Sequence, residues 1–363
     1  FEVHRKIGEG TFSSVYLGSL RRHSTLPAAD RRWFAIKHLV PTAHPARIEH
    51  ELRCLQDIGG KHNVIGVDLC LRHLDTIVFI MPYIPHRKFS EYVGEMDWEE
   101  LRRYMRALLE ALRHVHSFGI IHRDVKPSNF LYDRDNKRYL LVDFGLAQRV
   151  CVSPDEPAAP RPASDPAQDS APTLAHSNKR PITEGCGSKG NYKQLVRGES
   201  GACCVCVQRE AATCACACAG VGGVCAGGGC ATRAVARAPR AGTQGFRPPE
   251  VLLKWPRQSA AVDLWAAGVV YPLFRAADDV SALAEVTELL GTAAVQRAAH
   301  HLGTCRLSRV IASSFEAGKW VAGFPDSAFA LAAHLLEPAP AQRPSAAAAL
   351  SHAFLADPAP HTT

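Results

Sequence analysis

The start of the chain alternates apolar and polar side chains on both sides of a glycine-containing turn. The stretch FEVHRKIGEGTFSSVYLG predicts a β-hairpin over residues 1–18, and WFAIKHLV and TIVFIM predict two further strands. Between these strands, HPARIEHELRCLQDIGG has apolar residues at helical spacing, begins with Pro45 and stops at Gly59 and Gly60. This pattern predicts a β-rich unit that contains one helix.

A second, longer helix is predicted in the segment MDWEELRRYMRALLEALRHVHSFG. Asp97 and Glu100 have the spacing of a capping box, and apolar residues recur on one face of the helix up to Gly119. Several strands followed mainly by helices predict an α+β protein with two lobes.

Composition divides the chain into three zones. Residues 151–238 are rich in Pro, Ala, Ser, Gly and Cys, and they offer too few aromatic residues to offset the entropy of ordering. The globular pattern resumes near Ala241 and continues to Phe354. We therefore predict a long, mostly flexible insertion into one fold.

The totals narrow the classes of function. The 363 residues are 47% hydrophobic and 21% charged with a formal net charge of +7, which is typical of a soluble globular protein. The charge favours an acidic or phosphorylated partner, but no dense run of Lys and Arg predicts direct nucleic-acid binding. No apolar run approaches the roughly 18 residues of a membrane-spanning helix, so no membrane association is expected. The cysteines gather in the insertion, which favours a reducing compartment over a disulfide scaffold.

Candidate chemistry begins at the glycine turn. Gly8 and Gly10 would let the backbone approach a phosphate closely, and Val15 could cover a base. A plain hairpin turn with two glycines is the alternative reading of this stretch.

The strand FAIK ends in a lysine that could neutralise phosphate oxygens. Lys37 would need a carboxylate to hold it in place, and Glu51 on the following helix is the preferred partner. Glu51 lies one turn before Leu55 on the apolar side of that helix, whereas Glu49 is the competing candidate.

The most informative segments are IIHRDVKPSNFLY and YLLVDFGLA. Asp124, Lys126 and Asn129 lie within six residues on a predicted loop, and Asp143 follows a short buried strand. Phosphoryl transfer needs a carboxylate that orients the attacking hydroxyl, oxygen ligands for Mg²⁺ and cations beside the migrating phosphate. In these segments the chain resembles the eukaryotic protein-kinase superfamily.

The resemblance implies a bilobal protein-kinase fold with a small β-rich N-lobe and a larger helical C-lobe. It assigns the N-lobe and hinge to residues 1–83 and the C-lobe to residues 84–150 and 239–355. The insertion of residues 151–238 then falls in the activation segment.

The resemblance also implies the roles of individual residues. Asp124 matches the catalytic base and Lys126 the γ-phosphate contact, and lysine at that position is typical of the serine/threonine class. Asn129 and Asp143 match the Mg²⁺ ligands. The matching ATP-binding residues are Ile7, Gly8, Glu9, Gly10, Val15, Ala35, Lys37, Glu51, Met81, Pro82 and Tyr83.

Further matches follow the insertion. Glu250 is expected to pair with Arg343, and Asp263 is expected to brace the catalytic loop. Thr243 resembles a substrate-docking threonine, for which we expect a structural role. Residues matching the apolar column between the lobes, which plain core packing explains equally, are Leu55, His122 and Phe144.

The phrases IGEGTFSSVYL, HRDVKPSNFLY, LVDFGLAQ and PRAGTQGFRPPEVL are similar to the cell division cycle 7-related protein kinases. That family also has a large insertion in the activation segment. The resemblance implies a nuclear serine/threonine kinase that is switched on by a regulatory activator subunit. It further implies phosphorylation of the minichromosome maintenance helicase at Ser or Thr beside an acidic or phosphorylated residue. This reaction would start DNA replication and promote the G1/S transition of the cell cycle.

A cysteine cluster late in the insertion is similar to one in this family. Cys216, Cys218 and Cys225 reproduce the family spacing, and Cys230 follows, so we expect these four thiolates to bind Zn²⁺. Drift of a low-complexity segment is the alternative. Other available ligands are Cys203, Cys204, Cys206 and Cys214. A zinc module that binds nucleic acid is disfavoured, because few basic or aromatic residues surround the cluster.

Two departures from the pattern stand out. Gln244 stands where the family has proline. After DLWAAGVV, kinases continue a buried helix by about eight residues, whereas here Tyr271 follows Val270 directly. Two lost turns would remove several buried side chains at roughly 2–5 kcal/mol each. A catalytically silent kinase fold that binds partners is therefore the alternative function.

Overall fold

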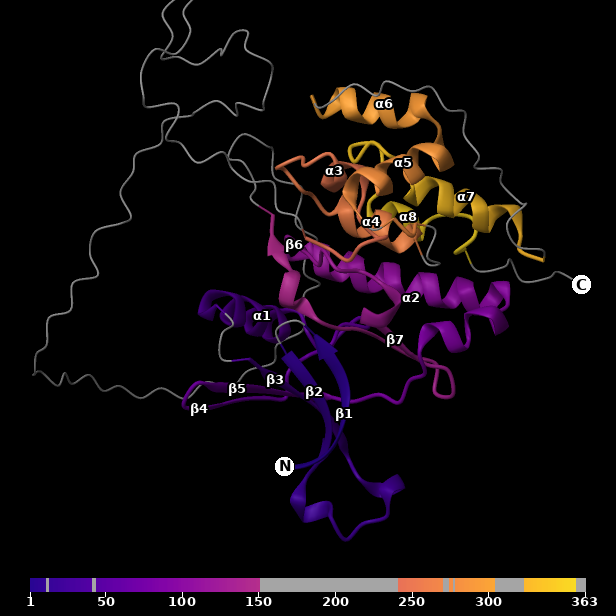
Figure 1. Cartoon of the computed structure of the whole chain (residues 1–363). Helices are drawn as coiled ribbons and strands as arrows, with labels where there is room; N and C mark the ends of the chain where they lie inside the picture. Colours follow the sequence, from indigo (N-terminus) through magenta and orange to yellow (C-terminus); the bar gives the residue numbers. More distant parts are fainter. Residues whose placement is uncertain are drawn as a thin grey trace, which may run out of the picture. The chain divides into compact units, whose positions relative to one another are not determined.

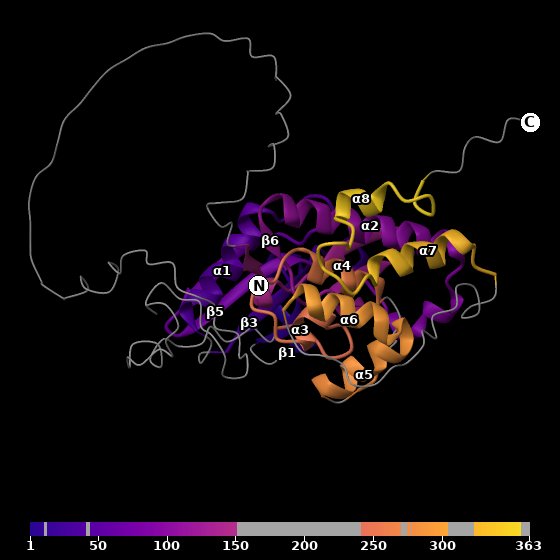
Figure 2. The ribbon, with the colours of Figure 1, turned by 90° about the horizontal axis from the view of Figure 1, so that it is seen from above.

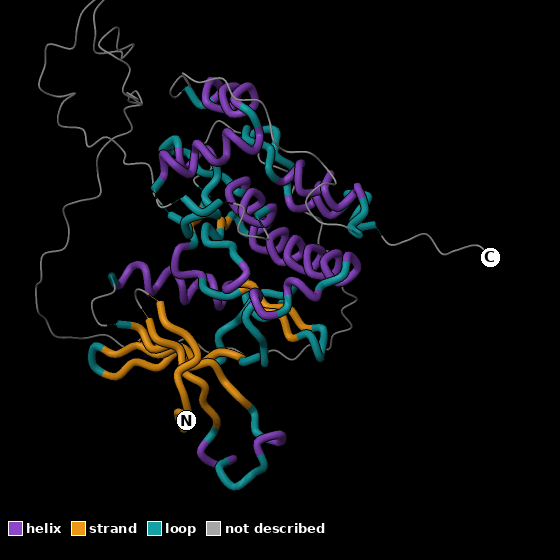
Figure 3. Tube along the Cα trace, turned by 45° about the vertical axis from the view of Figure 1, so that its right-hand side comes forward, coloured by secondary structure: helices purple, strands orange, loops and turns teal. Residues whose placement is uncertain are grey.

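The computed structural model of the chain describes residues 1–10, 13–40, 44–150, 241–269, 274–276, 278–303 and 323–356. Its N-terminal part is a five-stranded antiparallel sheet with the strand order β1-β2-β3-β5-β4 (Figures 1 and 3). The strands are β1 (Glu2–Gly10), β2 (Ser13–Ser19), β3 (Trp33–Leu39), β4 (Leu69–His73) and β5 (Thr76–Pro82). Short 3₁₀ helices η1 (Arg21–His23) and η2 (Ala28–Asp30) connect β2 to β3.

Strand β3 determines which way Lys37 faces. Side chains of a strand alternate between its two faces, so Ala35, Lys37 and Leu39 share one face. Ala35 and Leu39 belong to the main core, whereas Phe34 and Ile36 belong to a small cluster on the opposite face of the sheet. Lys37 therefore faces the interior of the molecule.

Helix α1 (Pro45–Asp57) packs into the same core cluster as the inward-facing residues Ala35 and Leu39 of β3. His44 caps the helix by accepting a hydrogen bond from the backbone N–H of Ala46, and Pro45 occupies the first turn, where its missing N–H costs nothing. The helix buries Glu51, Cys54 and Leu55, so the predicted apolar side is confirmed and includes one carboxylate.

The long helix α2 (Trp98–Ser117) confirms the predicted apolar stripe, and most of its stripe residues are buried. Asp97 accepts a hydrogen bond from the Glu100 backbone N–H at 2.6 Å. The predicted capping box is nevertheless only half right, because the Glu100 carboxylate accepts from the Tyr132 hydroxyl and from Arg134. A charged guanidinium and a phenol outcompete a helix-end N–H for this buried carboxylate.

Short elements surround the loop that follows α2. Strand β6 (Ile120–Ile121) pairs with β9 (Gln148–Arg149), and β7 (Phe130–Asp133) pairs with β8 (Arg138–Leu141). These two ladders fix both ends of the segments that contain Asp124 and Asp143. The 3₁₀ helices of this region are η3 (Phe89–Glu91), η4 (Val93–Glu95), η5 (Pro127–Asn129) and η6 (Phe144–Leu146).

The remaining described elements are helical and lie on the other side of α2 from the sheet in Figure 1, and Figure 2 shows them from above. They are α3 (Pro249–Leu252), α4 (Ala261–Gly268), α5 (Asp279–Leu290), α6 (Thr292–His301), α7 (Asp326–Leu335) and α8 (Ala346–Leu350). The sequence prediction of a β-rich N-lobe with one helix and a helical C-lobe is confirmed.

Helix α4 ends at Gly268, as the shortened sequence predicts. The helix nevertheless contributes a large side chain to the core, because Trp265 is fully buried. Its ring stacks on Phe274 with ring centroids 6.2 Å apart and an interplanar angle of 13°. The two rings belong to a second apolar cluster, which contains residues of α3, α5 and α6. Phe274 thus contributes to the packing around Trp265, the large buried side chain of α4.

The predicted insertion of residues 151–238 lies outside the described residues, and its boundaries stay a prediction. Among the helices that the structure describes, none is long and apolar enough to cross a membrane.

Candidate active site

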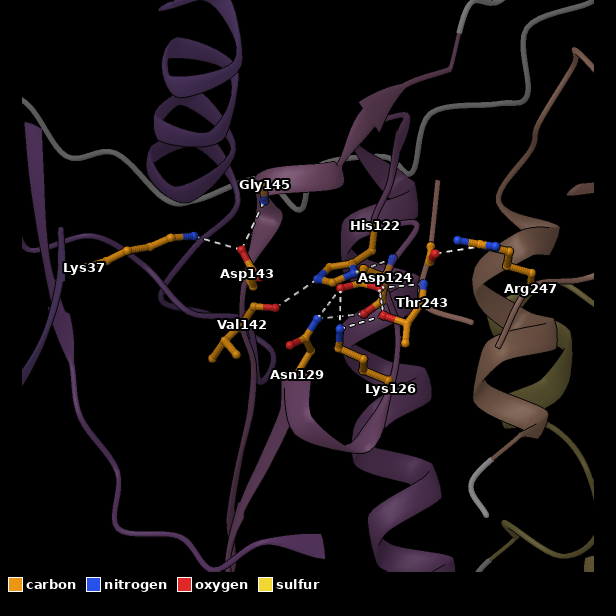
Figure 4. Close-up of polar contacts among 11 residues, drawn as sticks. Lys37, His122, Asp124, Lys126, Asn129, Val142, Asp143, Gly145, Thr243 and Arg247 are labelled. Atoms are coloured by element: carbon orange, nitrogen blue, oxygen red, sulfur yellow. Dashed lines mark hydrogen bonds and ion pairs between the residues drawn. The ribbon is translucent and has the colours of Figure 1, made fainter. Parts of the chain in front are cut away.

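Lys37 lies between two carboxylates. Its Nζ is 2.5 Å from Glu51 Oε1 and 2.8 Å from Asp143 Oδ1, and Figure 4 shows the contact with Asp143. Burial disfavours the Lys37 ammonium, but the charges of Glu51 and Asp143 outweigh it and raise the pKa of Lys37. Lys37 is therefore held as a fixed positive charge.

The choice between the two candidate partners of Lys37 is settled by burial. Glu51 is buried beside Lys37, whereas Glu49 is exposed and forms an ion pair with Arg53 at 2.5 Å. The preferred pairing with Glu51 is confirmed.

Asp143 sits at a turn that aims its carboxylate at Lys37. Its backbone is in the left-handed region, with φ 68°, and its Oδ1 accepts from the backbone N–H of Gly145 at 3.4 Å. Arg47 on α1 donates to the Gly145 carbonyl at 2.8 Å, which fixes this turn against the helix. Asp143 is half exposed, and the neighbouring protein partly desolvates its carboxylate and opposes ionisation, but Lys37 lowers the pKa of the carboxyl below its usual value.

Asp124 is the centre of a second group of polar contacts (Figure 4). Its Oδ2 accepts from Lys126 Nζ at 2.8 Å and from Asn129 Nδ2 at 2.9 Å. Its Oδ1 accepts from the Thr243 backbone N–H at 3.0 Å and from Thr243 Oγ1 at 2.6 Å. Lys126 Nζ also donates to Thr243 Oγ1 at 2.6 Å. The structure therefore brings together residues separated by more than a hundred positions in the chain.

The loop that presents Asp124 is anchored from helix α4. The fully buried Asp263 accepts from the backbone N–H groups of His122 and Arg123 at 2.8 and 2.7 Å. His116 Nε2 lies 2.9 Å from the same carboxylate. The expected bracing role of Asp263 is confirmed as a contact, and it holds Arg123 at φ 67°, a conformation that is rare for a non-glycine residue.

The predicted apolar column is buried throughout. The rings of His122 and Phe144 meet edge to face with centroids 4.8 Å apart, and His122 Nε2 lies 3.0 Å from the Val142 carbonyl oxygen. Leu55 is 2% exposed and belongs to the same core cluster as Phe144. These contacts join α1 to the segment that contains Asp143.

Among the predicted ATP-binding residues, Val15, Ala35 and Met81 lie on the inner face of the N-terminal sheet. Ala35 on β3 pairs with Met81 on β5, and both are buried. Ile7, Val15 and Tyr83 pack partly against the main core, and Pro82 ends β5. Glu9 is exposed and binds Lys6 at 2.9 Å, so the structure does not bring its side chain to the polar site.

The two glycines of the β1–β2 turn are not required by packing. A Cβ added at Gly8 would come no closer than 3.5 Å to Val15, and one at Gly10 no closer than 3.6 Å to Ser13. The protein's own contacts therefore tolerate a side chain at either position. Their bare backbone leaves room for close approach of a phosphate group, so these residues fit a nucleotide.

Asn129 and Asp143 offer oxygen donors that fit a magnesium ion. Asn129 uses its Nδ2 to bind Asp124, which leaves its Oδ1 for a cation. The side chain of Asp143 is 48% exposed, and Val142, its neighbour, donates its backbone N–H to the Asn129 carbonyl. A carboxylate and an amide oxygen are hard donors of the kind that Mg²⁺ prefers.

The sequence missed two residues that organise the site, His116 and Arg47. Their partners, Asp263 and Gly145, are far from them in the chain, and neither residue stands out from the charged residues around it. By contrast, the expected Glu250–Arg343 ion pair forms at 2.8 Å, with both side chains fully buried.

The predicted zinc ligands Cys216, Cys218, Cys225 and Cys230 lie outside the described residues, and so do their alternatives. Within the described part of the chain, no cluster of three or more His, Cys, Asp or Glu side chains is arranged to bind a metal ion.

Comparisons with known proteins agree with this geometry. The protein kinase domain family matches residues 1–159. The non-specific serine/threonine protein kinase Cdc7 of Drosophila melanogaster is 35% identical over 82% of this chain and 58% of its own length. The cell division cycle 7-related protein kinase of Homo sapiens is 34% identical over 84% of this chain and 67% of its own length. The cell cycle serine/threonine-protein kinase hsk1 of Schizosaccharomyces pombe is 32% identical over 82% of this chain and 57% of its own length.

The chain thus spans little more than half of the fly and yeast relatives and two thirds of the human one. The similarity covers both the β-rich and the helical part of the described fold. The chain belongs to the family of Cdc7-related protein kinases.

Proposed function

We propose that the chain is a serine/threonine protein kinase that uses ATP and Mg²⁺. Two groups of polar contacts support this most strongly. In one, Lys37 binds Glu51 and Asp143. In the other, Asp124 accepts hydrogen bonds from Lys126, Asn129 and Thr243. They provide a fixed cation, two metal-type oxygen donors and an oriented carboxylate, which are the parts that phosphoryl transfer needs.

In this proposal, Asp124 accepts the proton of the substrate hydroxyl. A carboxylate has about four lone-pair sites, and the four donors from Lys126, Asn129 and Thr243 fill them. A substrate hydroxyl must therefore displace one donor. Lys126 is the one that can leave, because its ammonium sits on a flexible stem and is drawn to phosphate oxygens. Its departure would free Asp124 Oδ2 for the hydroxyl and would place a cation beside the transferred group.

The nucleotide side is built from Lys37, Asn129 and Asp143. Lys37 would bind phosphate oxygens, and its position is set by Glu51. Asn129 Oδ1 and the Asp143 carboxylate would hold Mg²⁺, which supplies electrostatic stabilisation of the phosphate charge when it is bound.

We extend the proposal to regulation and substrate on the strength of the family resemblance. The kinase is switched on by a regulatory activator subunit and acts in the nucleus. Its substrate is the minichromosome maintenance helicase, and its activity promotes the start of DNA replication in the cell cycle. The yeast relative is a cell cycle serine/threonine-protein kinase, and this similarity supports the cell-cycle part of the proposal.

The test is transfer of labelled phosphate from ATP to a helicase-subunit peptide. The chain is co-purified with its regulatory subunit and compared with an Asp124→Asn variant, which keeps the shape of the side chain but removes the proton acceptor. We expect transfer by the parent complex and a loss of at least about 100-fold in the variant.

The early end of α4 at Gly268 favours one competing function, a kinase fold that binds nucleotide and partners without transfer. Absence of transfer by a folded complex that binds Mg²⁺-ATP would support this alternative and contradict the kinase proposal.

We also propose that Cys216, Cys218, Cys225 and Cys230 bind one zinc ion. The support is their spacing in the sequence and the similar cluster of the family. The metal content of freshly purified protein tests this, with Cys216→Ser/Cys218→Ser as the comparison. A value below about a tenth of an equivalent of zinc in the parent protein would contradict it.

A further inference from the structure

The segment of residues 242–247, which we call the docking segment, has two attached faces. On one face, Thr243 is bonded to Asp124 and Lys126. On the other face, the docking segment rests on the residues that precede and begin α5. The second attachment is not part of the chemistry described above.

Two side-chain contacts form the second attachment. Gln244 Nε2 donates to the Ala276 carbonyl at 2.8 Å. Arg247 Nη1 donates to Asp279 Oδ1 at 2.9 Å, and its Nε donates back to the Gly242 carbonyl at 3.0 Å. Figure 4 shows Arg247 on the far side of Thr243 from Asp124. The Arg247–Asp279 pair is largely buried, with side chains 18% and 11% exposed, so water screens it little.

The backbone of the docking segment lies directly on its support. Gly245 has φ +82°, and a Cβ added there would lie 2.8 Å from the Phe274 carbonyl oxygen. No side chain fits at this contact, so the backbone of Gly245 stays in close contact with the Phe274 carbonyl. Phe274 is itself fixed by its stack on Trp265.

The support is held in place by a carboxylate on α5. Glu285 Oε2 accepts from the backbone N–H groups of Arg275 and Ala276 at 2.8 and 3.1 Å. This fixes the backbone that leads into Ala276, the residue whose carbonyl receives the Gln244 hydrogen bond. Gln244 stands where the resembled family has proline, and proline has no side-chain donor. This chain therefore makes a contact that a proline at the same position could not make.

We propose that Gln244, Asp279 and Glu285 are positioning residues for the phosphate acceptor. They act through the docking segment. Its position determines where Thr243 lies relative to Asp124, and where the substrate peptide with its hydroxyl group lies. Displacement of reacting groups by about 1 Å costs up to about 100-fold in rate. None of the three residues contacts Lys37, Glu51 or Asp143, so their effect falls on the peptide substrate and spares the nucleotide. This inference rests on the proposed kinase activity.

The test compares three single variants of the complex with its regulatory subunit: Gln244→Ala, Asp279→Asn and Glu285→Ala. The control is Asp278→Asn. Asp278 is adjacent to Asp279 but caps α5, accepting from the N–H groups of Val280 and Ser281, and Asn preserves such a cap. Steady-state kinetics are measured separately for a helicase-subunit peptide and for ATP, together with the midpoint of thermal unfolding.

We expect each of the three variants to lower kcat/KM for the peptide by about 10-fold, with KM for ATP within about two-fold of the parent value. The Asp278→Asn control should match the parent complex in both.

Parent-like peptide kinetics in all three variants would overturn the inference while leaving the kinase proposal intact. Equal losses for peptide and ATP with a lower unfolding midpoint would also overturn it, because they indicate a structural role only. Absence of phosphate transfer by the parent complex would instead contradict the proposed kinase function, on which this inference depends.

Discussion

At the scale of single residues, burial decides which of several similar side chains forms the site. Glu49 and Glu51 are two residues apart on one helix, yet only Glu51 is buried beside Lys37. An exposed ion pair such as Glu49–Arg53 contributes about 0.3–0.5 kcal/mol, whereas removal of one partner from a buried pair leaves an uncompensated charge. Two glutamates with the same chemistry therefore differ in their contribution, because one is buried in the site and the other is exposed.

This difference predicts the outcome of a matched pair of substitutions. Glu51→Gln should lower kcat/KM for ATP by about 100-fold, because Lys37 loses the charge that fixes it among the phosphate-binding groups. Glu49→Gln should leave the same constant within about two-fold, since its pair is exposed. Steady-state kinetics with varied ATP check both, and equal effects of the two substitutions would contradict the assignment.

At the scale of elements, Glu100 connects the start of α2 to the β7–β8 hairpin. Its carboxylate accepts from Tyr132 on β7 at 2.8 Å and from Arg134 Nη2 at 2.8 Å. Hydrogen bonds from Arg134 outweigh the effect of burial and, with Tyr132, lower the pKa of Glu100 below its usual value of 4.5. The ionised form of Glu100 therefore stabilises the packing of the hairpin on the helix.

The lowered pKa gives a pH-dependent prediction. A carboxyl group with a depressed folded-state pKa stabilises the fold above its unfolded-state pKa, and this contribution is lost as the pH falls through the folded-state value. The free energy of unfolding of Glu100→Gln should lie about 2 kcal/mol below that of the parent at pH 7. The difference should shrink progressively below pH 4.5, the usual value for the group.

Urea unfolding at pH 7 and at several values below pH 4.5 measures this difference. Glu99→Gln is the control, because Glu99 is half exposed and pairs with Arg103 only at 3.5 Å. A difference between parent and Glu100→Gln that does not change with pH would contradict the role of the ionised carboxylate.

The secondary-structure elements also show which parts of the fold the sequence could predict. Helices α1 and α2 and strands β1, β3 and β5 have apolar periodicities long enough to be recognised. Strand β4 escaped notice because Leu69 and Leu71 are exposed and the strand has no buried face to produce an alternation. Strands β6 and β9 have two residues each, too few for any period.

The site residues also fall into those that local sequence could predict and those that it could not. Lys37, Asp124, Asn129 and Asp143 lie in compact motifs, so local sequence was enough to propose them. The contact of Lys126 with Thr243 spans 117 positions, and that of His116 with Asp263 spans 147. Such pairs depend on the packing of distant elements, and no spacing in a single sequence encodes them. A family resemblance supplied Thr243 and Asp263, and nothing supplied His116.

At the scale of the whole described unit, one buried ion pair connects the region after the docking segment to the end of the fold. Arg343 binds Glu250 through two nitrogens, donates to the Ala261 carbonyl at 2.7 Å and lies over the Trp265 ring at 5.2 Å. A single guanidinium thus joins α3, the start of α4 and the second apolar cluster. Its loss should be felt by the whole helical lobe.

Arg343→Ala should lower the free energy of unfolding by about 3–5 kcal/mol, because Glu250 would remain buried without a counter-charge. The double variant Glu250→Gln/Arg343→Met should lose less than the single variant, since it leaves no unpaired charge. Unfolding in guanidinium chloride measures the free energy of unfolding of both variants and shows which of them loses more. Arg53→Ala, which breaks an exposed pair, should stay within about 0.5 kcal/mol of the parent.

The anchoring of the Asp124 loop by Asp263 has a consequence for the order of synthesis. A ribosome that has completed residue 150 has already made Lys37, Glu51, Asp124, Lys126, Asn129 and Asp143. The clamp on the His122 and Arg123 N–H groups comes from a residue about 140 positions later, and the Arg343 bridge later still. An unfinished chain therefore contains nearly all the reactive groups before the Asp263 clamp on the Asp124 loop exists, and the anchoring of that loop is completed only by residues made later.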